Sequence, residues 1–135
     1  MNREYEFKAW LKKEKKMVDV REINFADEQI SFETDDDILY AFFDEIELIP
    51  YIGLKDINGV KIFDGDIVES QLGIKYKVCF FESSGAFGAI TNYPYNDHKW
   101  FDDFSNMCVI NNQETYKNLE VIGNVWENKE LLENE

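Results

Sequence analysis

The sequence contains few of the residues on which catalytic and metal sites most often depend. Its 135 residues include one histidine, two cysteines, two prolines and seven glycines. So little proline and glycine excludes a collagen-like or linker-rich chain. The two cysteines, Cys79 and Cys108, lie far apart and in no metal-ligand spacing. We interpret them as buried thiols in a reducing cytoplasm, with a disulfide as the alternative.

Long apolar runs are absent as well. They extend over only a few residues, as in Val78-Cys79-Phe80-Phe81, whereas a membrane-spanning helix needs about 20. The first residues, 1–7, lack the apolar stretch of a signal peptide. We therefore expect a cytoplasmic protein with no membrane partner.

The chain nevertheless has enough apolar residues to fold. Hydrophobic residues make up 44% of the sequence and aromatic residues 16%, which excludes intrinsic disorder because disordered chains lack the apolar surface that offsets ordering entropy. Its length suits one domain, or a small domain with an appendage. Basic residues are scarce, 14 against 28 acidic residues, and the formal net charge of −14 disfavours nucleic acids and anionic membranes as partners.

The basic residues are concentrated near the N-terminus. Residues 1–21 hold seven basic and four acidic residues, a net +3, so the rest of the chain carries −17. Four lysines stand together in Lys12-Lys13-Glu14-Lys15-Lys16, which we interpret as a solvated turn between two strands because charge runs usually lie in water. The alternative is a basic element that meets an acidic surface, in the same subunit or in the next one.

Alternating apolar and polar residues predict a mainly β fold with short strands. In the N-terminal part we expect strands at 5–10, 17–20, 23–25, 29–33 and 44–49. Residues 38–43 are apolar without interruption and suit either a strand or a short helix. The preceding Asp35-Asp36-Asp37 lacks the spaced ligands and the glycine of a calcium loop, so we interpret it as solvated.

The stretch 51–68 contains the clearest turn signals. Asn58-Gly59 predicts a hairpin with a type I′ turn, and Asp64-Gly65-Asp66 predicts a second tight turn in which the glycine takes a positive φ. Further strands are predicted at 76–81, 85–90 and 119–126. Such a succession of short strands and glycine turns is typical of small barrels.

The C-terminal part combines polar connections with one closing strand. Residues 96–104 and 114–117 are interpreted as loops. The closing strand contains Gly123, which predicts a bulge. Residues 127–132 then predict a short terminal turn or helix.

Three blocks of the sequence resemble the YopX family of phage and prophage proteins. They are Arg3 with Phe7-Lys8-Ala9-Trp10, the central Tyr51-x-Gly53-Leu54-x-Asp56-x-x-Gly59-x-x-Ile62-x-x-Gly65-Asp66-Ile67-Val68, and the closing Val121-Ile122-Gly123-Asn124-Val125-Trp126-Glu127-Asn128. Together they span most of the chain in the family's order, whereas residues 84–118 show no motif of the family.

The resemblance implies an SH3-like barrel preceded by a smaller element, and expression from phage or prophage genes in the cytoplasm of the bacterial host. We accordingly divide the chain into an N-terminal α/β element, residues 1–50, and an SH3-like β-barrel with a closing strand and a short tail helix, residues 51–135. The resemblance supplies no established reaction and no functional residues.

A separate search for catalytic residues finds no convincing set. His98 is the only histidine, and both cysteines lie in apolar or mixed strands, where burial disfavours a thiolate. Neighbouring carboxylates such as Asp64 and Asp66, or Asp102 and Asp103, are expected by chance among 28 acidic residues. We predict that the protein is not an enzyme, and that it has no catalytic, cofactor-binding or metal-binding residues and no small-molecule substrate.

We therefore expect a phage or prophage protein that acts through protein–protein interaction and self-assembly, as a homo-oligomer with a host or phage protein as a further partner. Aromatic residues are enriched at interaction hot spots, although filling of the core and its rim would also use them. The candidate interaction residues are Trp10, Lys12, Lys13, Lys15, Lys16, Tyr93, Tyr95, Trp100 and Phe101.

The alternative function is related to nucleic acid. The basic N-terminal segment would bind nucleic acid weakly, or the acidic surface would mimic DNA and capture a host DNA-binding protein.

Overall fold

The computed structural model describes residues 5–81, 86–90, 107–108 and 117–131. Their contacts divide the chain into two compact units, Met1–Tyr51 and Ile52–Glu135, which we call the first unit and the second unit. None of the helices in the described ranges is long and apolar enough to cross a membrane.

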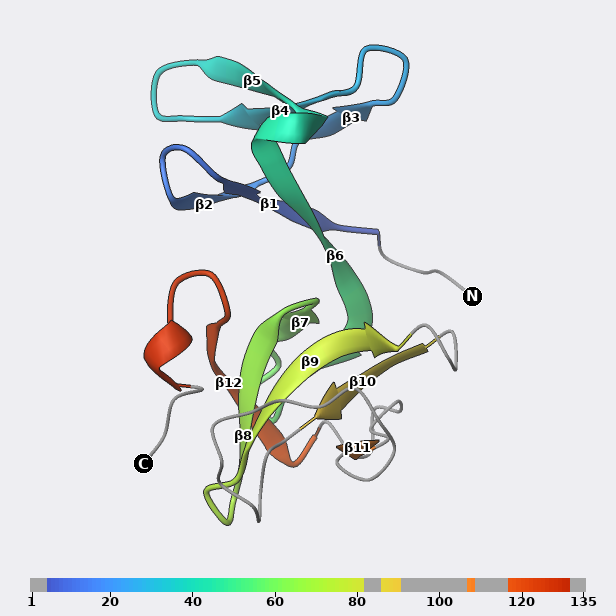
Figure 1. The fold of residues 1–135 in the computed structure, drawn as a ribbon, viewed down its shortest axis with the longest axis vertical. Coiled ribbons are helices and arrows are strands. Elements are labelled where there is room, and N and C mark those ends of the chain that lie inside the picture. The colour runs from blue at the N-terminus through green and yellow to red at the C-terminus, as the bar shows by residue number, and fades with distance from the viewer. Residues whose placement is uncertain (1–4, 82–85, 91–106, 109–116, 132–135) are drawn as a thin grey trace. The chain divides into compact units, whose positions relative to one another are not determined.

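The first unit is built from strands of two antiparallel sheets (Figure 1). Its elements are β1 (Phe7–Leu11), β2 (Lys16–Asp19), β3 (Glu22–Asn24), β4 (Gln29–Glu33), β5 (Ile38–Phe42), the 3-10 helix η1 (Phe43–Glu45) and the start of β6 (Ile46–Lys55). In one sheet β1 lies between β2 and β6, and in the other β4 lies between β3 and β5. The sequence predicts an α/β element here. Among the described residues of this unit, the helical part is the 3-10 helix η1.

A single run of chain passes from one sheet to the other at Val20 and Arg21. The Val20 amide donates to the Phe7 carbonyl at 3.0 Å, whereas the Arg21 amide donates to the Ser31 carbonyl of β4 at 2.8 Å. Because successive amides of an extended chain point in opposite directions, β2 and β3 form one bent strand that both sheets share.

The two sheets of the first unit enclose one apolar core. Its buried residues are Ala9, Leu11, Ile30, Phe32, Ala41 and Ile46. Several half-buried side chains pack against them: Val18, Val20, Ile23, Phe43 and Leu48. Two core members, Ala9 and Leu11, stand two positions apart on β1, as expected for a strand that buries one face.

The lysine-rich segment forms the turn between β1 and β2, as predicted. Residues 12–15 lie in this turn, and every residue from 12 to 16 is exposed. The turn closes with a 2.7 Å hydrogen bond from the Lys15 amide to the Leu11 carbonyl, and Lys15 adopts a φ of 56°. The interpretation of this charge run as a solvated turn is confirmed.

The apolar run 38–43 resolves into a strand followed by a helical turn. Residues Ile38–Phe42 form β5, and η1 begins at the next residue. The chain turns here because the Glu45 carboxylate accepts a 2.8 Å hydrogen bond from the Phe42 amide. The two alternatives predicted for this run, a strand and a short helix, each describe part of it.

The second unit contains a curled sheet of five strands. Its elements are β7 (Lys61–Phe63), β8 (Asp66–Ser70), β9 (Lys75–Phe81), β10 (Ala86–Ile90), β11 (Met107–Cys108), β12 (Leu119–Asn124) and the 3-10 helix η2 (Lys129–Leu131). The order in the sheet is β11-β10-β9-β8-β12, and β7 instead pairs with β6. The sheet curls as half a barrel, so the prediction of a mainly β, barrel-like fold is confirmed.

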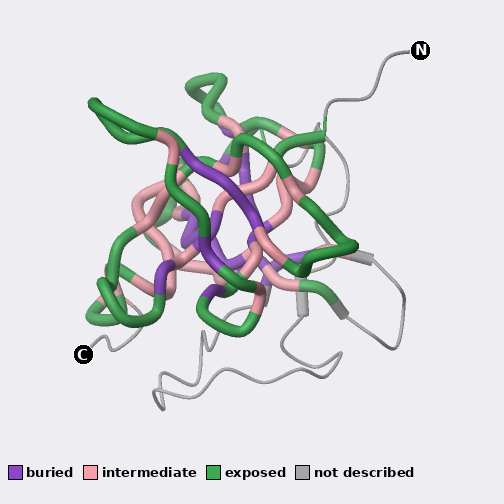
Figure 2. The backbone as a smooth tube through the Cα atoms, turned by 90° about the horizontal axis from the view of Figure 1, so that it is seen from above, coloured by how far each residue is buried: buried purple, intermediate pink, exposed green. Residues whose placement is uncertain are grey.

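Apolar side chains from most of these strands form the core of the second unit. The buried members are Ile62, Val68, Val78, Ala89 and Leu119. Figure 2 shows how buried stretches of backbone alternate with exposed turns along the chain. One turn is Gly73, whose φ of 85° lets the chain reverse between β8 and β9.

The loop between β6 and β7 differs from the predicted type I′ hairpin. That turn needs positive φ at both central residues, but only Gly59, at 81°, has it, and Asn58 does not. The Asp56 carbonyl accepts from the Gly59 amide at 3.0 Å, and the Asp56 amide donates to the Val60 carbonyl at 2.9 Å. The result is a longer loop with one left-handed residue, and the Asp56 side chain stabilises it.

Candidate functional site

Asp56, in the central sequence block, has a structural task. Its side chain is 4% exposed. One carboxylate oxygen accepts hydrogen bonds from the amides of Asn58, at 2.9 Å, and Val60, at 2.8 Å. The other oxygen accepts from the Val121 amide of β12, also at 2.9 Å. These bonds tie the β6–β7 loop to the closing strand.

The two carboxylates beside Gly65 have separate surroundings. Asp66 is buried, and its side chain accepts a 2.8 Å hydrogen bond from the Phe63 amide. Partial burial raises the pKa of Asp64 above its ordinary value of 3.8, while the positive charge of Lys77 acts in the opposite direction. The two carboxyl groups therefore lie in different environments.

The closing block packs against the same turn. A Cβ at Gly65 would overlap the ring of Trp126, so only glycine allows this indole to cover the turn. The pairing of β12 with β8 shifts between Val121 and Gly123, which confirms the predicted bulge. The side chain of Asn124 then caps the next turn by accepting from the amides of Trp126, at 3.0 Å, and Glu127, at 2.8 Å.

No cluster of three or more histidine, cysteine, aspartate or glutamate side chains suited to a metal occurs within the described part of the chain. Cys79 is half-buried in β9 and forms no disulfide. His98, Asp102 and Asp103 lie outside the described residues.

The first unit exposes large apolar side chains on β5. Tyr40 is 63% exposed, Phe42 51% and Leu39 43%. We call these three residues the β5 patch. Nearby, Phe25 is also exposed and makes an edge contact with Phe43, with ring centroids 6.0 Å apart. Successive side chains of a strand point to opposite faces, so Tyr40 and Phe42 share the outer face of β5, whereas Leu39 lies on the face of the buried Ala41. Exposed aromatic residues that share a face are typical of interaction surfaces.

Two carboxylates accept hydrogen bonds from amides on the outer edge of β5. Hydrogen bonds between residues 34 and 37 and between 28 and 43 set the pairing with β4, so the amides of Ile38, Tyr40 and Phe42 point away from that strand. Asp37 accepts from the Ile38 amide at 2.7 Å, and Glu45 accepts from the Phe42 amide. Only the middle amide of the three remains open to an added strand.

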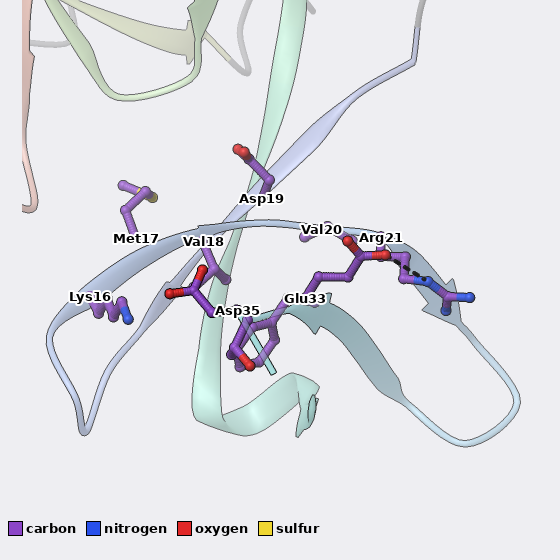
Figure 3. Close-up of a pocket in the computed structure, with 10 residues that line it drawn as sticks. Lys16, Met17, Val18, Asp19, Val20, Arg21, Glu33 and Asp35 are labelled. Carbon is purple, nitrogen blue, oxygen red and sulfur yellow. Dashed lines mark ion pairs between the residues drawn. The ribbon is translucent and has the colours of Figure 1, made fainter. Parts of the chain in front are cut away.

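Two grooves open at the end of the first unit where β1 turns into β2. The larger, of about 660 Å³, is lined by residues 16–21 and 32–35 (Figure 3). The ion pair between Arg21 and Glu33, at 3.7 Å, lies at one end, and Lys16 and Asp35 lie at the other. Its floor includes the buried ring of Phe32.

The second groove, of about 400 Å³, shares Phe32 with the first. Its other walls include Lys12 and Lys13 on one side and Leu39 and Tyr40 on the other. The turn of residues 12–16, which we call the lysine turn, therefore lies between the two grooves and beside the β5 patch.

The lysines of this turn differ in their surroundings. Lys12 bonds to the Asp44 carbonyl at 3.4 Å and forms an ion pair with Glu47 at 3.7 Å, so part of the basic segment meets an acidic surface of its own subunit. In the part of the chain that the structure describes, Lys13, Lys15 and Lys16 form no ion pair.

The structure places only some of the predicted interaction residues. Trp10 is half-buried in β1, opposite Met17 and Glu47. The four lysines are exposed at the turn. The predicted aromatic residues of the later loops lie outside the described residues: Tyr93, Tyr95, Trp100 and Phe101.

The β5 patch was missed from the sequence. An uninterrupted apolar run favours a strand that is buried on both faces, whereas the exposure of β5 depends on which of its faces the neighbouring elements leave uncovered. Its one available signal is the position between acidic residues, Asp35–Asp37 before it and Asp44 and Glu45 after it. Charged residues are common on edge strands, where they discourage further pairing.

Comparisons with known proteins show both sequence and structural similarity. A model of the YopX protein family matches residues 6–133. The crystal structure of protein EF1440 from Enterococcus faecalis is similar to this chain with a TM-score of 0.62 and 23% sequence identity, over 97% of this chain and 99% of that chain. At this identity the likeness shows a shared fold. No curated protein matches the chain.

Proposed function

The chain belongs to the YopX family, and from this premise we propose that it acts without catalysis, by binding other protein chains and copies of itself through the first unit. The proposal places it among phage or prophage proteins that work in the cytoplasm of the bacterial host.

The observation that carries the proposal is the β5 patch. Burial of apolar surface drives most protein association, at roughly 25 cal/mol per Å². Tyr40 and Phe42 are more than half exposed on an edge strand, and Tyr40 lines the groove of about 400 Å³. Tyrosine in such a position combines a large apolar ring with a polar hydroxyl, which suits a reversible interface.

The second unit supports a non-catalytic role. Its buried carboxylates, Asp56 and Asp66, accept hydrogen bonds from backbone amides and hold loops in place. A general acid or base needs a carboxyl group that can reach a substrate, and these two groups face the interior.

The test is the mass of the chain in solution as a function of concentration, measured by light scattering. We expect an oligomer that the double substitution Tyr40→Ser with Phe42→Ser converts to a monomer. Leu72→Ser is the control, because Leu72 is 87% exposed but lies in a turn of the second unit. A wild-type monomer at all concentrations, or equal effects of both variants, would contradict self-association through β5.

A role related to nucleic acid is the second candidate. It is supported by three exposed lysines that form no ion pair with any described residue, Lys13, Lys15 and Lys16, and opposed by the net charge of −14. A gel shift at low salt tests direct binding, and the absence of retardation would remove it. Recovery of basic DNA-binding host proteins with the purified chain would instead support mimicry of DNA by the acidic surface.

A further inference from the structure

We infer that two copies of this chain associate face to face through the charged end of the first unit, the lysine turn of each copy facing the aspartate turn of the other. The lysine turn is residues 12–16, and the aspartate turn is residues 34–37 between β4 and β5. The inference rests on the proposed self-association and names its surface.

The two turns carry equal and opposite charge. The lysine turn has four lysines and one glutamate, a net +3, and the aspartate turn has three aspartates, a net −3. All eight of these charged side chains belong to exposed residues. The charges of both turns are therefore accessible to a second copy of the chain.

Both turns lie at the same end of the first unit. Lys16 and Asp35 line the same groove, and Figure 3 shows them together at the end away from Arg21. Figure 1 shows the β1–β2 and β4–β5 turns projecting on one side. The end of the unit is therefore dipolar, with its positive and negative parts side by side.

The turns do not neutralise each other within one chain. Lys12 forms an ion pair with Glu47. Among the described residues, no ion pair joins Lys13, Lys15 or Lys16 to the aspartate turn. Asp37 accepts a hydrogen bond from the amide of its neighbour, so Asp35 and Asp36 are the aspartates without a described partner.

A dipolar surface is complementary to itself under a two-fold rotation. The rotation brings the lysine turn of each copy onto the aspartate turn of the other, so both contacts form at once, as an isologous interface requires. Leu39 and Tyr40 line the groove beside the lysine turn and supply the apolar part of the contact. Opposite charges then select the orientation, and apolar burial supplies the affinity.

Pairing of β5 with β5 of a second copy is a poorer alternative. In an antiparallel pair, the aspartate turn of one copy would meet Asp44 and Glu45 of the other, which places like charges together. The outward amides at both ends of β5 are also occupied by Asp37 and Glu45. Contact through the two turns avoids both penalties.

The test exchanges the charges in two variants of the full chain. Lys13→Glu with Lys16→Glu makes both turns acidic, and Asp35→Lys with Asp36→Lys makes both turns basic. Each variant alone is expected to dissociate with a Kd raised about tenfold or more, because like charges then face each other. An equimolar mixture is expected to recover dimers that contain one copy of each variant, identified by intact mass under native conditions.

The control for the lysine variant makes the same change in net charge at another place. Lys117→Glu with Lys129→Glu reverses two exposed lysines of the second unit and is expected to leave the Kd unchanged. Thermal unfolding followed by circular dichroism shows that each variant is folded before its mass is interpreted.

The outcomes separate this inference from the proposed function. A wild-type dimer that both charge variants leave intact, and that Tyr40→Ser with Phe42→Ser disrupts, would overturn the turn-to-turn contact and retain the β5 patch. Dissociation of each variant without recovery in the mixture would also overturn the inference. A wild-type monomer at every concentration would overturn self-association itself.

Discussion

Single residues in the second unit work mainly by satisfying the backbone. The Asp56 carboxylate serves three amides, one of them 65 positions away in the sequence. Buried donors without an acceptor are costly, so such a residue is needed for folding whether or not it takes part in function.

Replacement of Asp56 by alanine leaves those three amides without their acceptor. We expect the free energy of unfolding to fall by about 3 kcal/mol or more, because each unsatisfied buried group costs about 1–3 kcal/mol. Asp56→Asn retains one acceptor oxygen and is expected to lose less. Urea unfolding of both variants measures the difference, and equal losses would contradict this account.

Gly65 and Gly73 form a matched pair for measuring the contact with Trp126. Both have positive φ, 87° and 85°, but an added Cβ meets the indole only at Gly65. We expect Gly73→Ala to cost about 1 kcal/mol from backbone strain and Gly65→Ala about 1–3 kcal/mol more from overpacking. In a chain that carries Trp126→Leu, the difference between the two glycine variants should shrink.

Asp64 makes the stability of the fold depend on pH. A carboxyl group whose pKa is raised on folding contributes stability below its ordinary value of 3.8, and this contribution is lost as the pH rises through the raised pKa. Asp64→Asn should therefore gain stability relative to the wild type as the pH rises from acid to neutral. Unfolding measured across this range tests the sign, and a constant difference would contradict it.

At the scale of elements, β5 shows how an edge strand is kept from uncontrolled pairing. Asp37 and Glu45 occupy two of its outward amides. Native proteins commonly block exposed edges, because an open row of amides recruits further strands.

Removal of this protection should promote aggregation. We expect Asp37→Ala with Glu45→Ala to increase the binding of an amyloid-sensitive dye and the turbidity of concentrated solutions. Glu120→Ala with Glu130→Ala is the control, because it removes the same number of charges from exposed residues of the second unit whose side chains form no described hydrogen bond. Equal aggregation of the two proteins would show that charge, and not the two hydrogen bonds, keeps the edge closed.

The elements also show what local patterns can predict. Residues 29–33 alternate in polarity and form β4 with those bounds, as the period of two predicts. Burial does not follow that period, because Ser31 is buried together with Ile30 and Phe32. Asn58-Gly59 predicts a tighter turn than the chain adopts, since the decisive contact comes from the side chain of Asp56 and from β12, which is distant in sequence. The β5 patch was missed because exposure depends on which faces the other strands cover.

At the scale of the whole molecule, the charge is distributed differently from what the linear sequence indicates. Residues 1–21 carry +3, but the first unit as a whole has seven basic and fourteen acidic residues, the same numbers as the second unit. Four of the fourteen basic residues thus gather in one turn on an acidic body.

The dependence of self-association on salt shows which of these charges controls it. Salt screens exposed charges over a Debye length of about 10 Å at ~0.1 M ionic strength. Contact between the opposite turns predicts that added salt raises the Kd of the wild-type dimer, whereas dominant repulsion between two chains of net charge −14 predicts a lower Kd. Sedimentation at several salt concentrations distinguishes the two.

The sequence by itself determined the mainly β class, the family, the solvated lysine turn and the bulge in the closing strand. These features depend on alternation, on glycine and on charge runs, which act over a few residues. The tertiary structure alone decided the exposure of the β5 patch, the long-range role of Asp56 and the meeting of the lysine and aspartate turns at one end of the first unit. These features depend on which distant segments pack together, and burial and electrostatic contact are properties of that packing. The scarcity of basic residues therefore became informative only when the fold placed the lysine turn, with a net charge of +3, beside the aspartate turn, with a net charge of −3.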